Sequence, residues 1–523
     1  MPAAAAGRKA ESRPGAAVSV LRRVASQASF YLVAETLAQV SGLVSFPIFT
    51  RIFTQAQYGI MGLVNSTFQL AGTVSGMGLR PAVVRLWGEF KNGGRAGGVR
   101  ALASTMLSAS FLIGVVVWAL LLCVWFLPDH LLQRHARELI VMASAVVLFR
   151  NITRMVESIM QSQEKALLRS AIIVGERYLT LVFALLFVVG FGWGLRGLFG
   201  GVLLAEGLLF LFTLGYALRR LRWKPRWLDG RVVRESMLYG LPLLGTNVAG
   251  FITDLGDNYL LEYFRGSEEL GVYRAGYQLG TYATMFFVAA VNSALIPVTM
   301  NLWSEKGPEE TRRGLQDFLR WYLLIAVPVL FGVWALGGDL IGLMAGEKWL
   351  PAVAVLPWVL VAKVIYGAYY PAMAGLYLSK RTGVVALFLG GAALLNVLLN
   401  LVLIPGMTII PGRLAIPALG MEGAAITTLI AYAFYVFGGG LVSRRHLKLR
   451  FPWRSFAAYL AAAVAMFFVL RWIPSPDSNA LTLLVKVPAG AVLYAGLASA
   501  LDARARDTLR RLAGRLARRG GGR

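Results

Sequence analysis

The sequence contains little of what soluble enzymes use for chemistry. It has one cysteine and three histidines, and it has 26 acidic residues compared with 52 lysines and arginines. Cys123 has no partner for an internal disulfide, and His130, His135 and His446 all fall in polar stretches, where they form neither an intramembrane relay nor a metal cluster. The absence of a GxxxxGK[ST] loop excludes direct use of ATP.

Long polar loops are also missing. The longest stretch expected to face outward, Gly406–Glu422, is rich in proline and glycine and carries no acid/base pair. A membrane glycosyltransferase, ligase or polymerase needs such a pair on a sizeable extracytoplasmic loop. The sequence therefore predicts a protein that is not an enzyme and that uses no cofactor and no metal.

What the chain does have is apolar surface, with 57% hydrophobic residues and a mean hydropathy of +0.64. Apolar runs of about twenty residues alternate with short polar stretches, which is the pattern of membrane-spanning helices. One large soluble core is the alternative, but its helices would show polar faces. We predict an all-α polytopic membrane protein with about fourteen spans. They are expected near 28–49, 58–80, 101–127, 138–160, 170–191, 197–218, 237–261, 271–300, 317–337, 351–376, 383–405, 420–442, 455–472 and 480–501.

The net charge of +26 would indicate a nucleic-acid partner in a soluble protein. Here the basic residues gather in alternate polar stretches: before the first span, after the second, in 219–236, in 444–454 and after Leu501. Such stretches stay on the cytoplasmic side of a membrane. We therefore predict no nucleic-acid partner, both termini in the cytoplasm, and contact between the basic loops and anionic lipid headgroups.

One phrase occurs twice in the chain. Residues 79–89 read LRPAVVRLWGE and residues 295–305 read LIPVTMNLWSE, and an echo precedes each copy, YGIM at 58–61 and LGVY at 270–273. Each copy is expected to end an apolar run and open a polar loop. So long a period indicates two related halves of a membrane protein, with chance similarity of two helix ends as the alternative.

The repeat and the basic stretches together predict the domain organisation. We expect a cytoplasmic tail at 1–27, an N-lobe of six spans at 28–218 and a basic cytoplasmic linker at 219–236. A C-lobe of six spans follows at 237–442, then an extra helix pair at 443–501 and a basic amphipathic tail at 502–523. Because each lobe has an even number of spans, the two have the same orientation and form a parallel repeat.

Ionisable side chains inside spans are costly unless they face the protein interior or water. When adjacent spans are folded as hairpins, Arg154 lies level with Glu176, and Asp257 lies level with Arg274. We predict that each pair neutralises itself, with a purely structural role as the alternative to a role in coupling. Two further acidic side chains on polar faces are candidates for coupling or structural charges: Glu35 and Asp254.

Two cations, Arg150 and Lys363, have no obvious acidic partner at their depth in this scheme. Because lone cations in a membrane call for an anionic ligand, we predict that they bind substrate from opposite halves. Arg80 and Arg85 are further candidates, with extension to the cytoplasmic headgroups as the alternative. Arg274 is also a candidate for binding substrate. Glu206 is interpreted as a packed polar group.

Several stretches resemble the bacterial polysaccharide flippases of the Wzx or O-antigen type. These are FPIFTRIFTQAQYG at 46–59, GLRPAVVR at 78–85 and YGLPLLGTNVAGFITDLGDNYLLEYFRGSEELGVYRAGYQLG at 239–280, and the resemblance covers most of 28–440. Such proteins belong to the multidrug/oligosaccharidyl-lipid/polysaccharide exporter superfamily. The resemblance implies two six-helix lobes around a central cavity that work by alternating access. It also implies a cargo of sugar linked to undecaprenyl diphosphate, which is moved to the outer leaflet.

The resemblance gives roles to particular side chains. Arginines suit a diphosphate because their planar fork binds phosphate oxygens, and Tyr366 and Tyr370 are candidates to stack on sugar rings. The resemblance implies a small or polar residue at position 274. Arg274 departs from that expectation. The alternatives are a cation-coupled multidrug antiporter and a lipid II flippase of the same superfamily. The predicted location is the bacterial cytoplasmic membrane, and a polysaccharide polymerase or another assembly protein is the candidate protein partner.

Overall fold

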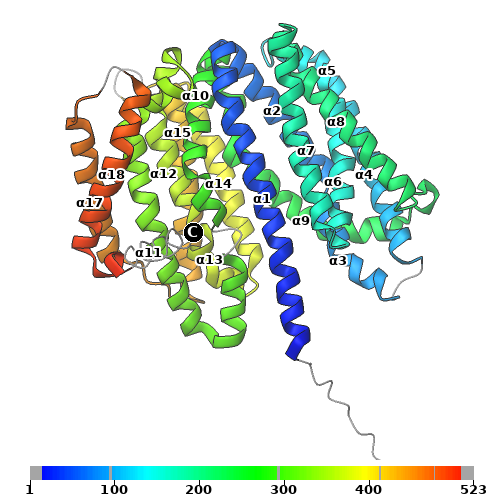
Figure 1. Cartoon of the computed structure of the whole chain (residues 1–523). Helices are drawn as coiled ribbons and strands as arrows, with labels where there is room; N and C mark the ends of the chain where they lie inside the picture. The colour runs from blue at the N-terminus through cyan, green and yellow to red at the C-terminus, as the bar shows by residue number, and fades with distance from the viewer. Residues whose placement is uncertain (1–13, 94–96, 291–294, 411–413, 476–477, 508–523) are drawn as a thin grey trace, which may run out of the picture. The chain divides into compact units, whose positions relative to one another are not determined.

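A computed structural model of the chain describes residues 14–93, 97–290, 295–410, 414–475 and 478–507 (Figure 1). Ten of the helices in these ranges are long and apolar enough to cross a membrane. An eleventh span results if α5 Arg134–Ala143 and α6 Ala145–Ser162, which meet at 43°, are counted as one. The chain is a helical multi-pass membrane protein, and the count of about fourteen spans stays a prediction.

Helices also occupy three predicted spans that are less apolar, namely α2 Gln55–Gly76, α9 Gly230–Leu255 and α10 Asp257–Ala290. The last two carry Asp254, Asp257 and Arg274, which are among the polar residues that lower their hydropathy. Most of the predicted tail at 502–523 lies outside the described residues.

The described chain folds into two compact units whose parts alternate along the sequence. Unit 1 contains the residues up to 45 together with 74–124 and 141–241, and unit 2 contains 46–73, 125–140 and the residues from 242 onward. The boundaries of the two predicted lobes stay a prediction.

Unit 1 is built around the packing of three helices. Its core forms where α3 Leu79–Lys91 lies against α4 Gly98–Leu122 and α6. α7 Ala166–Leu185 and α8 Gly194–Arg219 pack on each other and on α6, and the first parts of α1 Pro14–Ile52 and of α9 complete the unit. Short 3-10 or π segments lie at Cys123–Phe126, Leu186–Gly190 and Pro225–Trp227.

The repeated phrase is helical, which corrects the prediction that it opens a polar loop. The first copy is α3, and its apolar residues recur at helical spacing, so that Leu79, Val83, Leu86 and Trp87 are buried on one face. The second copy begins α11 Ile296–Met344, which breaks at Gly307 (φ 79°). Each copy is thus a short helix that precedes a long apolar one.

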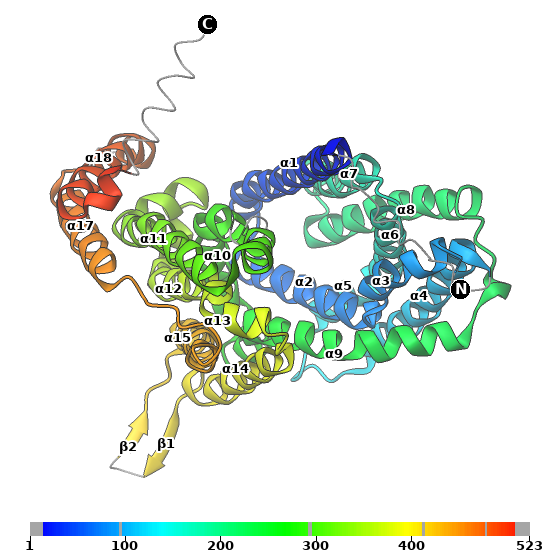
Figure 2. The ribbon, with the colours of Figure 1, turned by 90° about the horizontal axis from the view of Figure 1, so that it is seen from below.

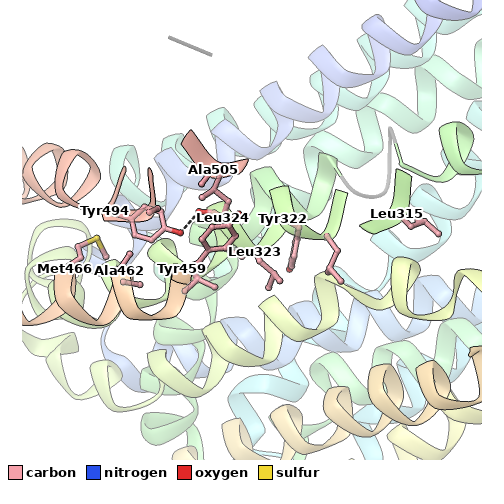
Figure 3. Packing of buried hydrophobic residues seen from close by; sticks show 14 of the residues in the cluster. Leu315, Tyr322, Leu323, Leu324, Tyr459, Ala462, Met466, Tyr494 and Ala505 are labelled. Atoms are coloured by element: carbon pink, nitrogen blue, oxygen red, sulfur yellow. Dashed lines mark hydrogen bonds between the residues drawn. The ribbon is translucent and has the colours of Figure 1, made fainter. Parts of the chain in front are cut away.

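Besides α10, α11 and most of α2, unit 2 contains the helices that follow α11. They are α12 Leu356–Gly367, α13 Tyr369–Leu378, α14 Thr382–Leu403, α15 Gly420–Ala433, α16 Gly439–Ser443, α17 Trp453–Trp472 and α18 Asn479–Leu501, with a 3-10 segment at Glu347–Ala354 and a π segment at Phe434–Gly438. α17 and α18 pack on α11, and Figure 3 shows the buried cluster that joins them, in which the Tyr494 hydroxyl donates to the Leu324 carbonyl at 3.0 Å.

The stretch Gly406–Glu422 contains a small ribbon that the all-α prediction did not include. β1 Met407–Ile410 pairs with β2 Leu414–Ile416 in antiparallel fashion and extends from the ends of α14 and α15 (Figure 2). The β-branched residues of TII at 408–410 favour extended backbone, which explains why this segment is not helical.

Two glycines set the distance between α2 and α10 within unit 2. A Cβ atom on Gly59 would lie 1.9 Å from the Ser267 carbonyl oxygen, and one on Gly271 would lie 1.9 Å from the Gln55 carbonyl oxygen. Both glycines come from the echo that precedes the repeated phrase. The two helices therefore cross backbone to backbone, which no side chain at these positions would allow.

The predicted linker at 219–236 is partly helical, because α9 begins at Gly230. The part before Gly230, which includes the 3-10 segment Pro225–Trp227, is held on α4 by four hydrogen bonds. The Trp223 side chain donates to Ser108 at 2.9 Å and the Lys224 amide to Ser104 at 3.3 Å, while Thr105 donates to the Trp227 carbonyl at 2.7 Å and accepts from the Asp229 amide at 3.2 Å. The linker is a fixed part of unit 1.

Candidate functional site

Unit 1 holds a cluster of charged side chains on the facing surfaces of α6, α7 and α8. Arg150 on α6 donates from Nε to Oε1 of Glu206 on α8 at 2.8 Å, and its Nε also lies 3.9 Å from Oε1 of Glu176 on α7. The prediction that Arg150 lacks an acidic partner is therefore wrong. Glu206, interpreted from the sequence as a packed polar group, is that partner.

Arg154, one helical turn further along α6, bridges two carboxylates. Its Nη2 lies 2.8 Å from Oε2 of Glu176, and its Nη1 lies 3.1 Å from Oε2 of Glu157. The first contact confirms the ion pair predicted by folding spans four and five as a hairpin. We call Arg150, Arg154, Glu157, Glu176 and Glu206 the arginine cluster.

Burial divides the arginine cluster into two layers. The three glutamate side chains are 4% exposed or less, whereas Arg150 and Arg154 are 30% and 26% exposed. The carboxylates are thus the buried partners and fix the orientation of the arginines, whose side chains stay partly exposed. Arg150 uses Nε and Nη2 on Glu206, which leaves Nη1 to donate elsewhere.

Two other predicted cations of unit 1, Arg80 and Arg85, have contacts of their own. The Arg80 guanidinium lies against the backbone of Gly76 at the end of α2, where a Cβ atom would come within 2.6 Å of it. Arg85 is exposed and stacks on Tyr239, with 4.6 Å between Cζ and the ring centroid. Glu35 on α1 is exposed. Their predicted roles stay predictions.

Unit 2 holds a second cluster, which joins α9, α10, α12 and α15. Lys363 Nζ on α12 lies 2.6 Å from Oδ1 of Asp254 on α9, so this cation too has the acidic partner that the sequence scheme missed. The same oxygen accepts from the Tyr277 hydroxyl on α10 and from the Tyr432 hydroxyl on α15, the latter at 2.9 Å. We call these four residues the lysine cluster.

The tyrosines proposed to stack on sugar rings already stack on other tyrosines. Tyr366 has the ring of Tyr432 at 4.6 Å and that of Tyr369 at 5.4 Å between centroids. Tyr370 is 1% exposed and packs on Tyr377 at 5.3 Å. The Tyr370 ring therefore presents no face to a ligand in this conformation, and the role of Tyr366 stays a prediction.

Asp257 does not form the predicted ion pair with Arg274. α10 breaks at Gly266 (φ 83°), which places the hairpin turn where the sequence analysis expects it. Across this turn the Asp257 carboxylate accepts from the Tyr273 hydroxyl, and it also accepts from Thr428 on α15 at 3.3 Å. Arg274 lies instead near Tyr277, with 5.8 Å between Cζ and the ring centroid. Among the described residues, hydroxyl groups rather than a cation are the direct partners of Asp257.

Sequence reasoning missed Tyr273, Tyr277, Tyr432 and Thr428. A signal was present for the first two, because they are four residues apart on one helical face and follow Asp254 and Asp257, which are three apart on the neighbouring segment. No comparable signal marks Tyr432 and Thr428, which come from a helix much later in the chain.

The fold is that of known membrane transporters. The chain aligns with a lipid II flippase MurJ in an inward closed conformation at a TM-score of 0.74 and 16% identity, over 92% of this chain and 99% of that one. It also aligns with an inward-facing multidrug resistance MATE family transporter of the MOP superfamily at a TM-score of 0.58 and 16% identity, over 78% of this chain and 94% of that one. At such identity the likeness concerns the fold alone.

The family follows from the sequence. The polysaccharide biosynthesis protein family matches residues 24–303, more than half of the chain, and the chain therefore belongs to this family. The MatE family matches residues 242–402. The predicted resemblance to polysaccharide flippases is thus confirmed at the family level, and this family and fold are those of transporters rather than enzymes.

Three curated relatives are similar over part of their length. The teichuronic acid biosynthesis protein TuaB of Bacillus subtilis is 26% identical over 29% of this chain and 30% of its own. The probable low-salt glycan biosynthesis flippase Agl15 of Haloferax volcanii is 21% identical over 44% and 47%. The succinoglycan biosynthesis transport protein ExoT of Rhizobium meliloti is 25% identical over 65% and 66%. The matched part is therefore less than two thirds of each relative.

Proposed function

We propose that this protein is a flippase that moves an oligosaccharide linked to undecaprenyl diphosphate across the bacterial cytoplasmic membrane. The cargo would be a repeat unit of an O-antigen, capsule or exopolysaccharide. In this proposal fourteen spans form two six-helix lobes and an extra pair, both termini are cytoplasmic, and the lobes work by alternating access. Family membership supports the proposal, and so do two relatives, a probable glycan biosynthesis flippase and a succinoglycan biosynthesis transport protein.

The observation that carries the proposal is the layering of the arginine cluster. A diphosphate needs cationic donors when it leaves the headgroup region, because an uncompensated charge inside a membrane is costly. Arg150 and Arg154 have partly exposed side chains and are held by buried carboxylates. Because these carboxylates fix the arginines in advance, little conformational entropy is lost when an anion binds. Lys363 is left out of this anion site, since its ammonium is largely covered and bound to Asp254.

The same fold leaves two alternatives. A lipid II flippase would use the same headgroup chemistry, and the alignment with MurJ supports it at the level of fold. A cation-coupled drug antiporter would need an acidic pocket for its cargo. In unit 1 the arginines are the more exposed partners of three buried carboxylates, and in unit 2 the Asp254 carboxylate already binds Lys363, so we favour an anionic cargo.

The test is translocation in vesicles that contain the purified protein and an undecaprenyl-diphosphate-linked oligosaccharide. Transfer between leaflets is followed by the fraction of sugar that an external glycosidase removes. Loss of a charge-assisted hydrogen bond is worth about 1.5–3 kcal/mol, so Arg150→Ala is expected to slow transfer by roughly 10- to 100-fold. Arg150→Lys, which keeps the charge and loses the fork, should be intermediate.

The matched control is Arg219→Ala, an exposed arginine of the same unit that lies outside the arginine cluster. It should transfer cargo at the wild-type rate. Equal rates for Arg150→Ala and wild type would disprove the anion site, whereas no transfer by the wild-type protein would disprove the proposed cargo.

A further inference from the structure

The lysine cluster in unit 2 has the composition of a cation site. A single carboxylate oxygen of Asp254 receives the Lys363 ammonium at 2.6 Å and the hydroxyls of Tyr277 and Tyr432. The ammonium also lies 4.5 Å from the centroid of the Tyr277 ring and 5.9 Å from that of the Tyr432 ring. The cation is therefore held by one carboxylate and by the faces of two aromatic rings, which attract positive charge.

The chemistry of these groups selects a monovalent cation. Divalent Ca²⁺ takes six to eight oxygen ligands, commonly from several carboxylates, and Mg²⁺ requires an octahedral set. In the lysine cluster there is one carboxylate, and the two phenol groups donate to it. A small ion of single charge, or a primary ammonium group, matches one carboxylate and two ring faces.

The two charged partners are not equally shielded from water. The Lys363 side chain is 12% exposed, whereas the Asp254 side chain is 36% exposed. The Asp254 carboxylate is thus the more accessible partner, and the ammonium of Lys363 already occupies it. The nearby charges are those of Asp257, which hydroxyl groups bind, and of Arg274, which lies near the other side of the cluster at Tyr277.

We propose that Asp254, Tyr277 and Tyr432 form a binding site for a monovalent cation and that the ammonium of Lys363 is its tethered occupant. Unit 2 then supplies its own counter-ion at Asp254. The wild-type protein requires no dissolved cation at this position, and it takes one only when Lys363 is withdrawn or removed. This inference does not rest on the proposed cargo, because its test measures cation binding without transport.

The test uses the full-length protein in detergent and measures thermal unfolding at constant ionic strength in methylammonium, sodium or choline chloride. Lys363→Ala removes the tethered ammonium and leaves space for a free one. Its melting temperature is expected to rise by about 2 °C or more, with saturation, in methylammonium chloride relative to choline chloride. Wild type, whose site is filled, should not change.

The matched control is the double variant Lys363→Ala with Asp254→Asn, which lacks the carboxylate and should not respond to any of the salts. An equal response in the double variant, an equal response to choline, or no response in Lys363→Ala would overturn the proposal. If Lys363→Ala does not fold, Lys363→Met keeps the packing of the lysine stem. In that variant sodium should raise the melting temperature, and recovery that depends on pH alone would mean that a proton, not a cation, takes the place of Lys363.

Discussion

The two charged clusters use the same kind of ion pair with opposite shielding. In the arginine cluster of unit 1 the carboxylates are buried and the arginines are partly exposed. In the lysine cluster of unit 2 the ammonium is more covered than its carboxylate, at 12% against 36% exposure. The arginine cluster sets two guanidinium groups against three carboxylates, and the lysine cluster sets one ammonium against one carboxylate. The more exposed partner is cationic in unit 1 and anionic in unit 2.

We propose that the sign of the more accessible partner, more than the presence of a charge, indicates what such a site binds. A cation in front of buried carboxylates favours an anionic ligand, and a carboxylate in front of a covered ammonium favours a cation. The reason is that the exposed partner can exchange water for a ligand, whereas the buried partner only fixes its position. Four predictions test this comparison, in order of decreasing effect.

The largest effect is expected from Arg154→Gln. This change leaves Glu157 and Glu176 buried without the cation that bridges them. Removing one partner of a buried pair typically costs about 3–5 kcal/mol, so the melting temperature in detergent should fall sharply. Arg154→Lys should cost less because the charge remains. Unchanged stability of Arg154→Gln would show that the carboxylates are not held by this arginine.

A smaller effect is expected for Lys363→Met. The Asp254 carboxylate left behind is accessible to water and still accepts from two tyrosines, so we expect a loss of about 1.5–3 kcal/mol. The double variant with Asp254→Asn should recover part of this loss, and a double-mutant cycle on unfolding measures the coupling. Strictly additive losses would contradict the direct pair.

The third prediction concerns Asp257, whose partners are hydroxyl groups. Asp257→Asn and Tyr273→Phe should be coupled by about 1–2 kcal/mol, because each removes the same hydrogen bond. Asp257→Asn and Arg274→Gln should be additive within about 0.5 kcal/mol. If Asp257→Asn were coupled more strongly to Arg274→Gln than to Tyr273→Phe, the ion pair predicted from the sequence would be supported instead.

The smallest effect is expected for Arg85→Ala. Its guanidinium is exposed and contacts the Tyr239 ring, and such a contact is worth about 0.5–1 kcal/mol. Tyr239→Leu should give a similar loss, and the two changes together should cost little more than either alone. A loss as large as that of Arg154→Gln would mean that Arg85 belongs to the arginine cluster.

The sequence predicted best what depends on neighbours along the chain. The hairpin argument found Arg154 and Glu176 because they lie on consecutive spans joined by a short turn. It could not find the partners of Arg150 and Lys363, because α6 pairs with α8 there and α12 pairs with α9, which are not consecutive. Contacts of this kind are set by how helices pack in three dimensions, and hydropathy along one chain does not contain that information.

The repeated phrase shows a second limit of prediction from hydropathy. An amphipathic helix such as α3 has a polar face, so hydropathy alone reads its start as the beginning of a loop. The periodic positions of Leu79, Val83, Leu86 and Trp87 contain the correct answer, but only when they are tested for helical spacing.

The crossing of α2 and α10 has a consequence for which sequences this fold accepts. At Gly59 and Gly271 the space for a side chain is taken by backbone oxygen atoms of the opposite segment. In a saturation library, glycine should be the residue recovered at both sites, and alanine should be as poorly tolerated as larger residues. A substitution at either site would be rescued only by changes that move a whole helix. Selection for this helix crossing therefore acts on the codons of Gly59 and Gly271 together, although they are far apart in the gene, and it does so whatever the cargo.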